Sequence, residues 1–160
     1  MIILGVDPGK TGALAVVQVE KKQGVVLAVL DTPTHAISKG KTEVDAVQIA
    51  NWIENKRSNF GIDHAYVERV SSRPGQGVVS VFDFGKSYGA VMGVLAAIKM
   101  PTTFITPAEW KRNLRVPSDK KASRGRASQL MPSSSTYWPL VKHDGRAEAA
   151  MIGLYGANAR

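Results

Sequence analysis

Acidic residues stand at the ends of predicted strands, where they could do chemistry. Asp7 ends a short apolar run, Met1–Val6, and the turn-forming dipeptide Pro8-Gly9 follows it at once. Glu68 ends a second predicted strand, His64–Glu68. Because a carboxylate at the end of a buried strand is costly to desolvate, each of these acids needs a backbone donor or a cation as its partner.

A second pair of acids lies near the C-terminus. Asp144 and Glu148 are four residues apart in a predicted helix, so they share one helix face. If the first and fourth strands are neighbours, Asp7 and Glu68 end at one edge of the sheet, and the final helix could bring the pair beside them. Such a cluster would repel itself unless it were protonated or bound to cations.

The chemistry that this cluster could do is metal-dependent hydrolysis. The sequence contains no cysteine, and oxygen ligands suit Mg²⁺ or Mn²⁺ rather than structural zinc. Two such ions about 3.5–4 Å apart would clamp the attacking and leaving oxygens of a phosphodiester.

Each acid also has a structural interpretation. Asp7 could simply initiate the turn, and Glu68 could pair with Arg69 or Arg73 at the strand end.

The acids of the last helix have structural interpretations too. Asp144 is well placed to cap the helix N-terminus, and Glu148 could bond Arg146 or a lysine. His143 could be a ligand, a proton shuttle or an exposed residue before the helix, and its sequence context favours the exposed residue.

The charge of the chain points to a polyanionic partner. The 160 residues include 21 Lys and Arg against 13 Asp and Glu, a formal net charge of +8, and much of the excess follows Pro101. Nucleic acid is the leading candidate, ahead of an acidic membrane. No apolar run approaches the length of a membrane span and no signal peptide is evident, so we expect a cytoplasmic protein.

The elements alternate in the manner of a mixed α/β domain spanning residues 1–160. Three short N-terminal strands predict an antiparallel meander, residues 31–41 read as a loop, and a helix follows over 42–57. After the strand 64–68, helices are predicted at 78–100, 107–114, 120–131 and 144–157, with a short strand at 102–106.

The helix predicted at 78–100 carries small residues at every fourth position. Gly85, Gly89, Gly93 and Ala97 form a ridge that would allow another backbone to approach closely. The ridge could face the sheet of the same chain or a second subunit, and the spacing alone favours neither.

Several blocks, in order along the whole chain, resemble the RuvC-type Holliday junction resolvases, in particular their phage and prophage branch. The blocks are GVDPGKTGALAV, YVERV, SSRPGQGVVSVFDFGKSYGAVMGVLAA, TPAEWK, DKKASRGRA and HDGRAEAAMIGLY. The resemblance implies an RNase H-like fold, with a five-stranded mixed sheet (first three strands antiparallel) flanked by helices on both faces. It also implies a homodimer, with Gly85, Gly89 and Gly93 at the interface.

The resemblance assigns roles to the acids. Asp7, Glu68 and Glu148 match three of the acids that hold metal in the family. The fourth usually lies three residues before the last, which here is Gly145. Asp144 is its best substitute as a catalytic and metal-binding residue, with His143 next.

The resemblance also predicts how DNA is held. Lys111 and Lys120 resemble residues that contact the scissile backbone. The basic residues expected to bind DNA are Lys111, Lys120, Lys121, Arg124 and Arg126. Where many relatives have an aromatic residue that stacks on junction bases, this chain has Ser71, so Phe82 or Phe84 would serve if stacking occurs.

The predicted function is therefore resolution of four-way DNA junctions by a metal-dependent endonuclease. It would act as a dimer that cuts two strands symmetrically, with two Mg²⁺ ions per active site and Mn²⁺ able to replace them. Two alternatives stay open: an RNase H-like nuclease for flaps, other branched DNA or RNA–DNA hybrids, and a non-catalytic junction-binding protein.

Overall fold

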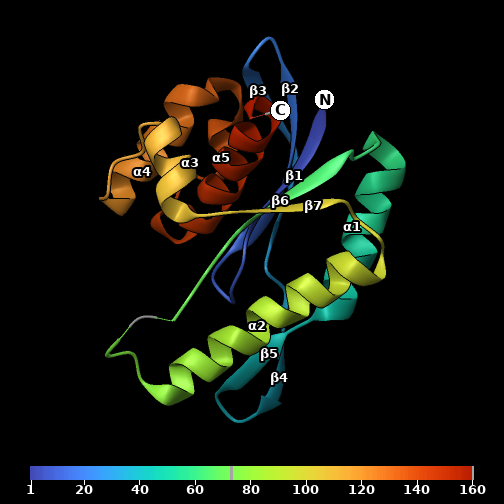
Figure 1. Ribbon diagram of the computed structural model, residues 1–160, viewed down its shortest axis with the longest axis vertical. Coiled ribbons are helices and arrows are strands. Elements are labelled where there is room, and N and C mark those ends of the chain that lie inside the picture. The colour runs from blue at the N-terminus through green and yellow to red at the C-terminus, as the bar shows by residue number, and fades with distance from the viewer. Residues whose placement is uncertain (73, 160) are drawn as a thin grey trace.

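β1 lies at the centre of a five-stranded sheet with the order β3-β2-β1-β6-β7. The computed structural model describes residues 1–72 and 74–159, and of Lys120 and Lys121 only the backbone (Figure 1). The strands are β1 (Ile2–Asp7), β2 (Ala13–Glu20), β3 (Gln23–Asp31), β6 (His64–Glu68) and β7 (Thr102–Ile105). β1, β2 and β3 pair antiparallel, whereas β6 runs parallel to both β1 and β7. The predicted mixed sheet is confirmed.

Helices cover both faces of this sheet (Figure 1). One face packs against α5 (Asp144–Asn158), with α3 (Pro107–Asn113) and α4 (Lys120–Leu130) beside it. The other face packs against α1 (Ala46–Phe60) and α2 (Val78–Ala97). Two 3₁₀ segments, Pro132–Tyr137 and Val141–His143, connect α4 to α5.

The alternation of side chains along β1 decides which way Asp7 projects. Leu4 and Val6 belong to the core under α1 and α2, and Ile3 belongs to the core under α5. Successive strand residues point to opposite faces, so Asp7 projects to the α5 side together with Ile3 and Gly5. The sheet thereby directs the acid toward the last helix.

Small residues let α5 lie directly on the sheet. A Cβ at Gly5 would stand 2.0 Å from the carbonyl oxygen of Ala149, and one at Gly153 would stand 2.9 Å from Val17 Cγ2. Real Cβ atoms essentially never come within 3.0 Å of another heavy atom, so glycine is required at this crossing. The Ala- and Gly-rich composition of α5 thus sets the distance between its acids and the strand ends.

The segment after β3 differs from the predicted loop and helix start. It forms a separate two-stranded hairpin, β4 (Thr34–Ser38) and β5 (Lys41–Val44), and α1 begins only at Ala46. The Asp45 carboxylate accepts a hydrogen bond of 2.9 Å from Gln48 N, which fixes the helix start there. The hairpin strands are polar and largely exposed, so no apolar pattern marks them in the sequence.

α2 is apolar yet poorly covered. Val78, Val79 and Phe82 are 84%, 82% and 68% exposed. By length and composition alone α2 could cross a membrane, because an 18-residue window of it has a mean hydropathy of 1.3 with 22% of that window buried, a property that the sequence does not lead us to expect. An exposed apolar helix of this size indicates a surface that something covers.

Candidate active site

Asp7 and Glu68 end neighbouring parallel strands at the same edge of the sheet. The pairing of Val6 with Val67 sets the two acids side by side one residue later. Tyr66 lies in the α5 core and Val67 in the opposite one, so Glu68 projects to the α5 side, as Asp7 does. Both acids line a hollow of about 480 Å³, and Glu148 of α5 lines it with them.

Asp144 lines an adjoining hollow of about 310 Å³, which it shares with Asp7 and Glu148. The two hollows thus meet at Asp7 and Glu148. We call them together the acidic hollow, the space lined by Asp7, Glu68, Asp144 and Glu148. The fold thus places Glu68 and Asp144 in adjoining hollows that share Asp7 and Glu148.

Glu68 is the most deeply placed of these acids. Its side chain accepts a hydrogen bond of 2.7 Å from Trp110 Nε1, and the residue is 8% exposed. Burial raises the pKa of the Glu68 carboxyl above its ordinary value, and the nearby Glu148 charge adds to this, while the Trp110 bond and Lys111 oppose it. A buried acid with such a pKa, in a hollow lined by other acids, is typical of a functional site.

Basic side chains hold the acids of α5. Lys111 Nζ lies 3.2 Å from Glu148 Oε1, and Arg124 Nε lies 2.7 Å from Asp144 Oδ1. Among the described residues, no three metal-ligating side chains lie close enough together to hold an ion as they stand. The two basic residues contact oxygens that a cation would need, so its binding would have to displace them.

The structural alternatives for these acids have mixed outcomes. Glu148 does bond a lysine, Lys111, but the prediction that Asp144 caps α5 is wrong, because Asp144 is the first helical residue and makes no capping bond. Glu68 bonds Trp110. Its suggested partner Arg73 lies outside the described residues.

The prediction that His143 is exposed is wrong. The residue is 7% exposed, and its Nδ1 accepts a hydrogen bond of 3.3 Å from Leu140 N. Burial, then the nearby Arg146, lowers the pKa of the His143 imidazole below its ordinary value. Because it is bonded within its own turn, His143 has a structural role in closing the segment before α5.

Gly145 lies where an acidic side chain has no room. A Cβ at this position would stand 2.7 Å from the carbonyl oxygen of Thr11 and 2.9 Å from Gly12 Cα. The turn after β1 therefore packs directly on α5, and no acidic side chain fits at 145 unless the turn moves. Asp144, one residue earlier, lines the hollow instead.

The basic residues expected at DNA differ in their placement. Arg124 holds Asp144, and Arg126 Nε donates to the carbonyl oxygen of Leu114 at 2.8 Å, so both also serve the packing of α4. The side chains of Lys120 and Lys121 lie outside the described part of the structure.

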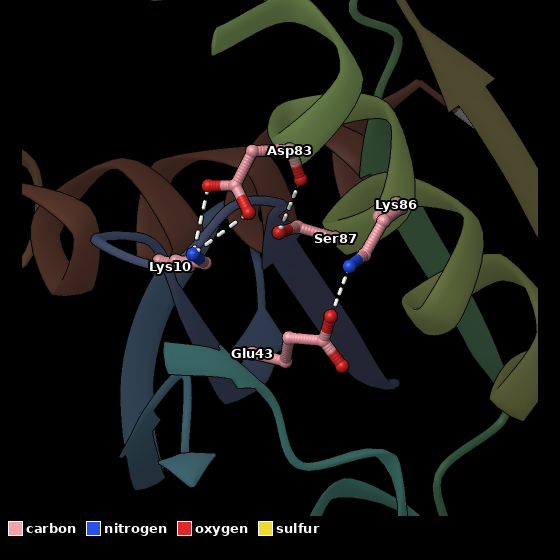
Figure 2. A network of polar contacts seen from close by, with 5 residues as sticks. All are labelled: Lys10, Glu43, Asp83, Lys86 and Ser87. Atoms are coloured by element: carbon pink, nitrogen blue, oxygen red, sulfur yellow. Dashed lines mark hydrogen bonds and ion pairs between the residues drawn. The ribbon is translucent and has the colours of Figure 1, made fainter. Parts of the chain in front are cut away.

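Two residues of the hollow were missed in the sequence. Lys10, in the turn after β1, and Asp83, on α2, both line it, with 2.7 Å between Lys10 Nζ and Asp83 Oδ2. Figure 2 shows this ion pair beside a second one, from Lys86 to Glu43 of β5. Charges three apart on an otherwise apolar helix, at 83 and 86, were the available signal.

The glycine ridge of α2 does not face the sheet. Gly85, Gly89 and Gly93 are exposed, and beyond the neighbouring backbone of α2 itself a Cβ at any of them would meet no atom of the described chain within 4 Å. The interpretation that the ridge packs within its own chain is therefore wrong. Of the two aromatic residues suggested for base stacking, Phe84 lines the hollow and lies against Gly9, and Phe82 is exposed.

Known structures share this architecture from end to end. Thermus thermophilus RuvC in complex with a Holliday junction substrate superposes with a TM-score of 0.69 at 20% identity, covering 98% of this chain and 93% of that one. The fold is that of the RuvC-type resolvases.

Other structures with this fold are more distant. The fowlpox virus Holliday junction resolvase gives a TM-score of 0.55 at 14% identity, covering 99% of both chains. The yeast mitochondrial Holliday junction resolvase gives 0.58 at 13%, covering 96% of this chain and 76% of that one. No family model matches the sequence, and a search of the curated proteins finds no match. The predicted RNase H-like fold is thus confirmed by structure rather than by sequence similarity.

Proposed function

We propose that this protein is a metal-dependent endonuclease that resolves four-way DNA junctions. The observation that carries the proposal is the acidic hollow: four carboxylates from β1, β6 and α5 line two adjoining hollows at one sheet edge, in a fold shared with Holliday junction resolvases. Two of these structural relatives are recorded with Holliday junction DNA. The net charge of +8 suits a nucleic acid substrate.

The residues of the hollow fit a hard divalent cation by donor type. All four acids offer carboxylate oxygens, the ligands that Mg²⁺ and Mn²⁺ prefer, and the raised pKa of Glu68 reflects a buried carboxyl that a cation would stabilise in its charged form. The metal, two ions in each active site, would be held by Asp7, Glu68, Asp144 and Glu148. When bound, such ions polarise the scissile phosphate and stabilise the leaving oxygen.

Other residues of the chain would position the substrate. Trp110 fixes the orientation of Glu68, and Lys111, released from Glu148, would contact the phosphate backbone. Lys120, Lys121, Arg124 and Arg126 would add backbone contacts along α4, which supply affinity without reading bases. A homodimer joined through α2 would present two such hollows, one for each strand that is cut.

Replacement of Asp7 by Asn tests the proposal. Asp7→Asn keeps the shape of the side chain but removes the charge that a cation needs, so the variant should bind a four-way junction with wild-type affinity and lose cleavage in Mg²⁺ by at least about 100-fold. Binding is measured by gel shift and cleavage on denaturing gels. Asp63→Asn is the matched control. Asp63 directly precedes β6, at the end of the strand opposite to Glu68, and an Asn there can still accept a hydrogen bond from Ile2 N.

Retained cleavage by Asp7→Asn would contradict the metal site. Parallel assays on flaps, plain duplex and RNA–DNA hybrids, with and without Mg²⁺, separate the alternatives. Preference for a flap or a hybrid would indicate a different nuclease, and junction binding without any cleavage would indicate a binding protein.

A further inference from the structure

The hairpin formed by β4 and β5 leaves the sheet at the same edge as the acidic hollow. Asp7 pairs with Ala13, and Ala13 pairs with Asp31 at the end of β3. The hairpin begins three residues later, at Thr34, so it extends from the strand ends that carry the acids. In Figure 1 it lies at one end of the molecule, with the β2–β3 turn at the other.

The hairpin is anchored at its base and exposed at its tip. Val44 is buried, and Glu43 forms an ion pair with Lys86 of α2, next to the pair of Lys10 with Asp83 (Figure 2). Residues 34–42 are all exposed, and β4 and β5 pair only with each other. Residues 34–42 therefore bury almost none of their own surface. Two ion pairs hold α2, one to Glu43 of the hairpin and one to Lys10 in the turn after β1.

The tip of the hairpin carries positive charge. Lys39 and Lys41 flank Gly40, which takes a left-handed φ of +74° in the turn. The acid of these two strands, Glu43, is neutralised by Lys86, so the lysines at the tip are not balanced locally. Ser38 and Thr42 beside them offer hydroxyl donors, and Lys, Ser and Thr side chains are among the groups that bond DNA phosphates.

A junction arm is long compared with the hollow, since one turn of duplex spans about 34 Å. The basic helix α4 packs on α5, on one side of the sheet edge, and the hairpin contacts α2, on the other. DNA that enters the acidic hollow therefore has a basic element on each side.

We propose that the β4–β5 hairpin is a second DNA-contacting element, in which Lys39 and Lys41 bind the phosphate backbone of a junction arm outside the acidic hollow. The proposal rests on the proposed function, because it names a further contact with the same substrate. It gives the hairpin a role in affinity and in arm placement, and none in the chemical step.

The test is junction binding by a hairpin variant against a matched control. Lys39→Gln with Lys41→Gln removes two exposed charges, and Lys21→Gln with Lys22→Gln removes two from the β2–β3 turn at the opposite end of the sheet. Both pairs are introduced into the Asp7→Asn protein, so that binding is measured without cutting. The hairpin variant should bind about five- to tenfold more weakly, and the slope of log affinity against log salt should fall by about 2. The control should match the Asp7→Asn protein.

Arm length supplies the second measurement. The deficit of the hairpin variant should disappear when the junction arms are shortened step by step, because short arms do not reach the hairpin. Equal binding by hairpin variant and control, or a deficit independent of arm length, would overturn the proposal. A change in the sedimentation of the hairpin variant would overturn it too, since the hairpin would then be a subunit contact.

Failure of the hairpin proposal is distinguishable from failure of the proposed function. If the wild-type protein neither binds nor cuts a four-way junction, both fall. If it binds and cuts while the hairpin lysines have no effect, only the hairpin proposal falls.

Discussion

The carboxylates of the acidic hollow are bonded by side chains that lie far from them in the sequence. The acids themselves could be predicted from the sequence, and their bonding partners could not. Asp7 and Glu68 are recognisable because an acid ends each apolar run. Trp110, which bonds Glu68, lies 42 residues further along the chain, and no periodicity or spacing marks that contact. The acids were predictable from local pattern, whereas their partners depend on how α3 packs against β6.

The buried charge of Glu68 predicts a conflict between stability and activity. Glu68→Gln keeps an oxygen that can accept from Trp110 Nε1 but removes the charge that burial disfavours. We expect the metal-free variant to be more stable than the wild type at pH 7, by about 1 kcal/mol in urea unfolding, and to be inactive in junction cleavage. Glu109→Gln, at a more exposed acid of α3, is the comparison for stability. A Glu68→Gln protein that is less stable would show that the charged carboxylate is already compensated.

At the scale of elements, an arginine clamp fixes α5 against the sheet. Arg146 Nε and Nη2 each donate to the Asp31 carboxylate at 2.6 Å, and Arg146 Nη1 donates to the carbonyl oxygen of Tyr137. Arg146 stands between Asp144 and Glu148 in the sequence. Its contact with Asp31 therefore holds the part of α5 that carries both acids against the end of β3. Two-point contact of this kind is the strong form of a surface ion pair.

The clamp should make stability depend on pH. Hydrogen bonding to Arg146, aided by its charge, holds the pKa of Asp31 below its ordinary value. The stabilisation is therefore present above the unfolded-state pKa and is lost as the pH falls through the folded pKa. Asp31→Asn should lower the free energy of unfolding at pH 7 by up to about 1 kcal/mol, a modest effect because Asp31 is largely exposed.

The measurement is urea unfolding of both proteins at pH 7 and at a pH below the folded pKa of Asp31. At the lower pH the difference should vanish, because the wild-type carboxyl is then protonated. A difference that persists there would mean that packing, rather than charge, accounts for it.

Elements with an apolar pattern were predicted well, and elements without one were not. The strands of the sheet and the helices after residue 78 lie within a few residues of their predicted bounds. The β4–β5 hairpin was missed because its strands are polar and mostly exposed, so burial leaves no alternation in the sequence. Asp45, which caps the N-terminus of α1, was the overlooked helix start signal that separates the hairpin from the helix.

At the scale of the whole molecule, the exposed face of α2 is the feature that a single chain leaves unexplained. The helix exposes Val78, Val79 and Phe82, and its glycine ridge is open to solvent. The spacing could not decide between the sheet and a second subunit, because that depends on how the helix is rotated about its axis. The structure turns Val91, Val94 and Leu95 toward the sheet and the ridge away from it.

A bulky side chain on the ridge should therefore break the proposed dimer. Gly89→Leu places a side chain where a second helix would approach, and overpacking of this kind costs about 1–3 kcal/mol, so the dimer dissociation constant should rise at least about fivefold. The monomer should fold at least as well as before, because leucine is a better helix former than glycine. Sedimentation velocity over a range of concentrations measures both. Gly125→Leu is the matched control, since Gly125 is also an exposed helical glycine with no atom near its Cβ position, but on α4. If Gly89→Leu sediments as the wild-type dimer does, α2 is not the interface, and its exposed face must meet another partner.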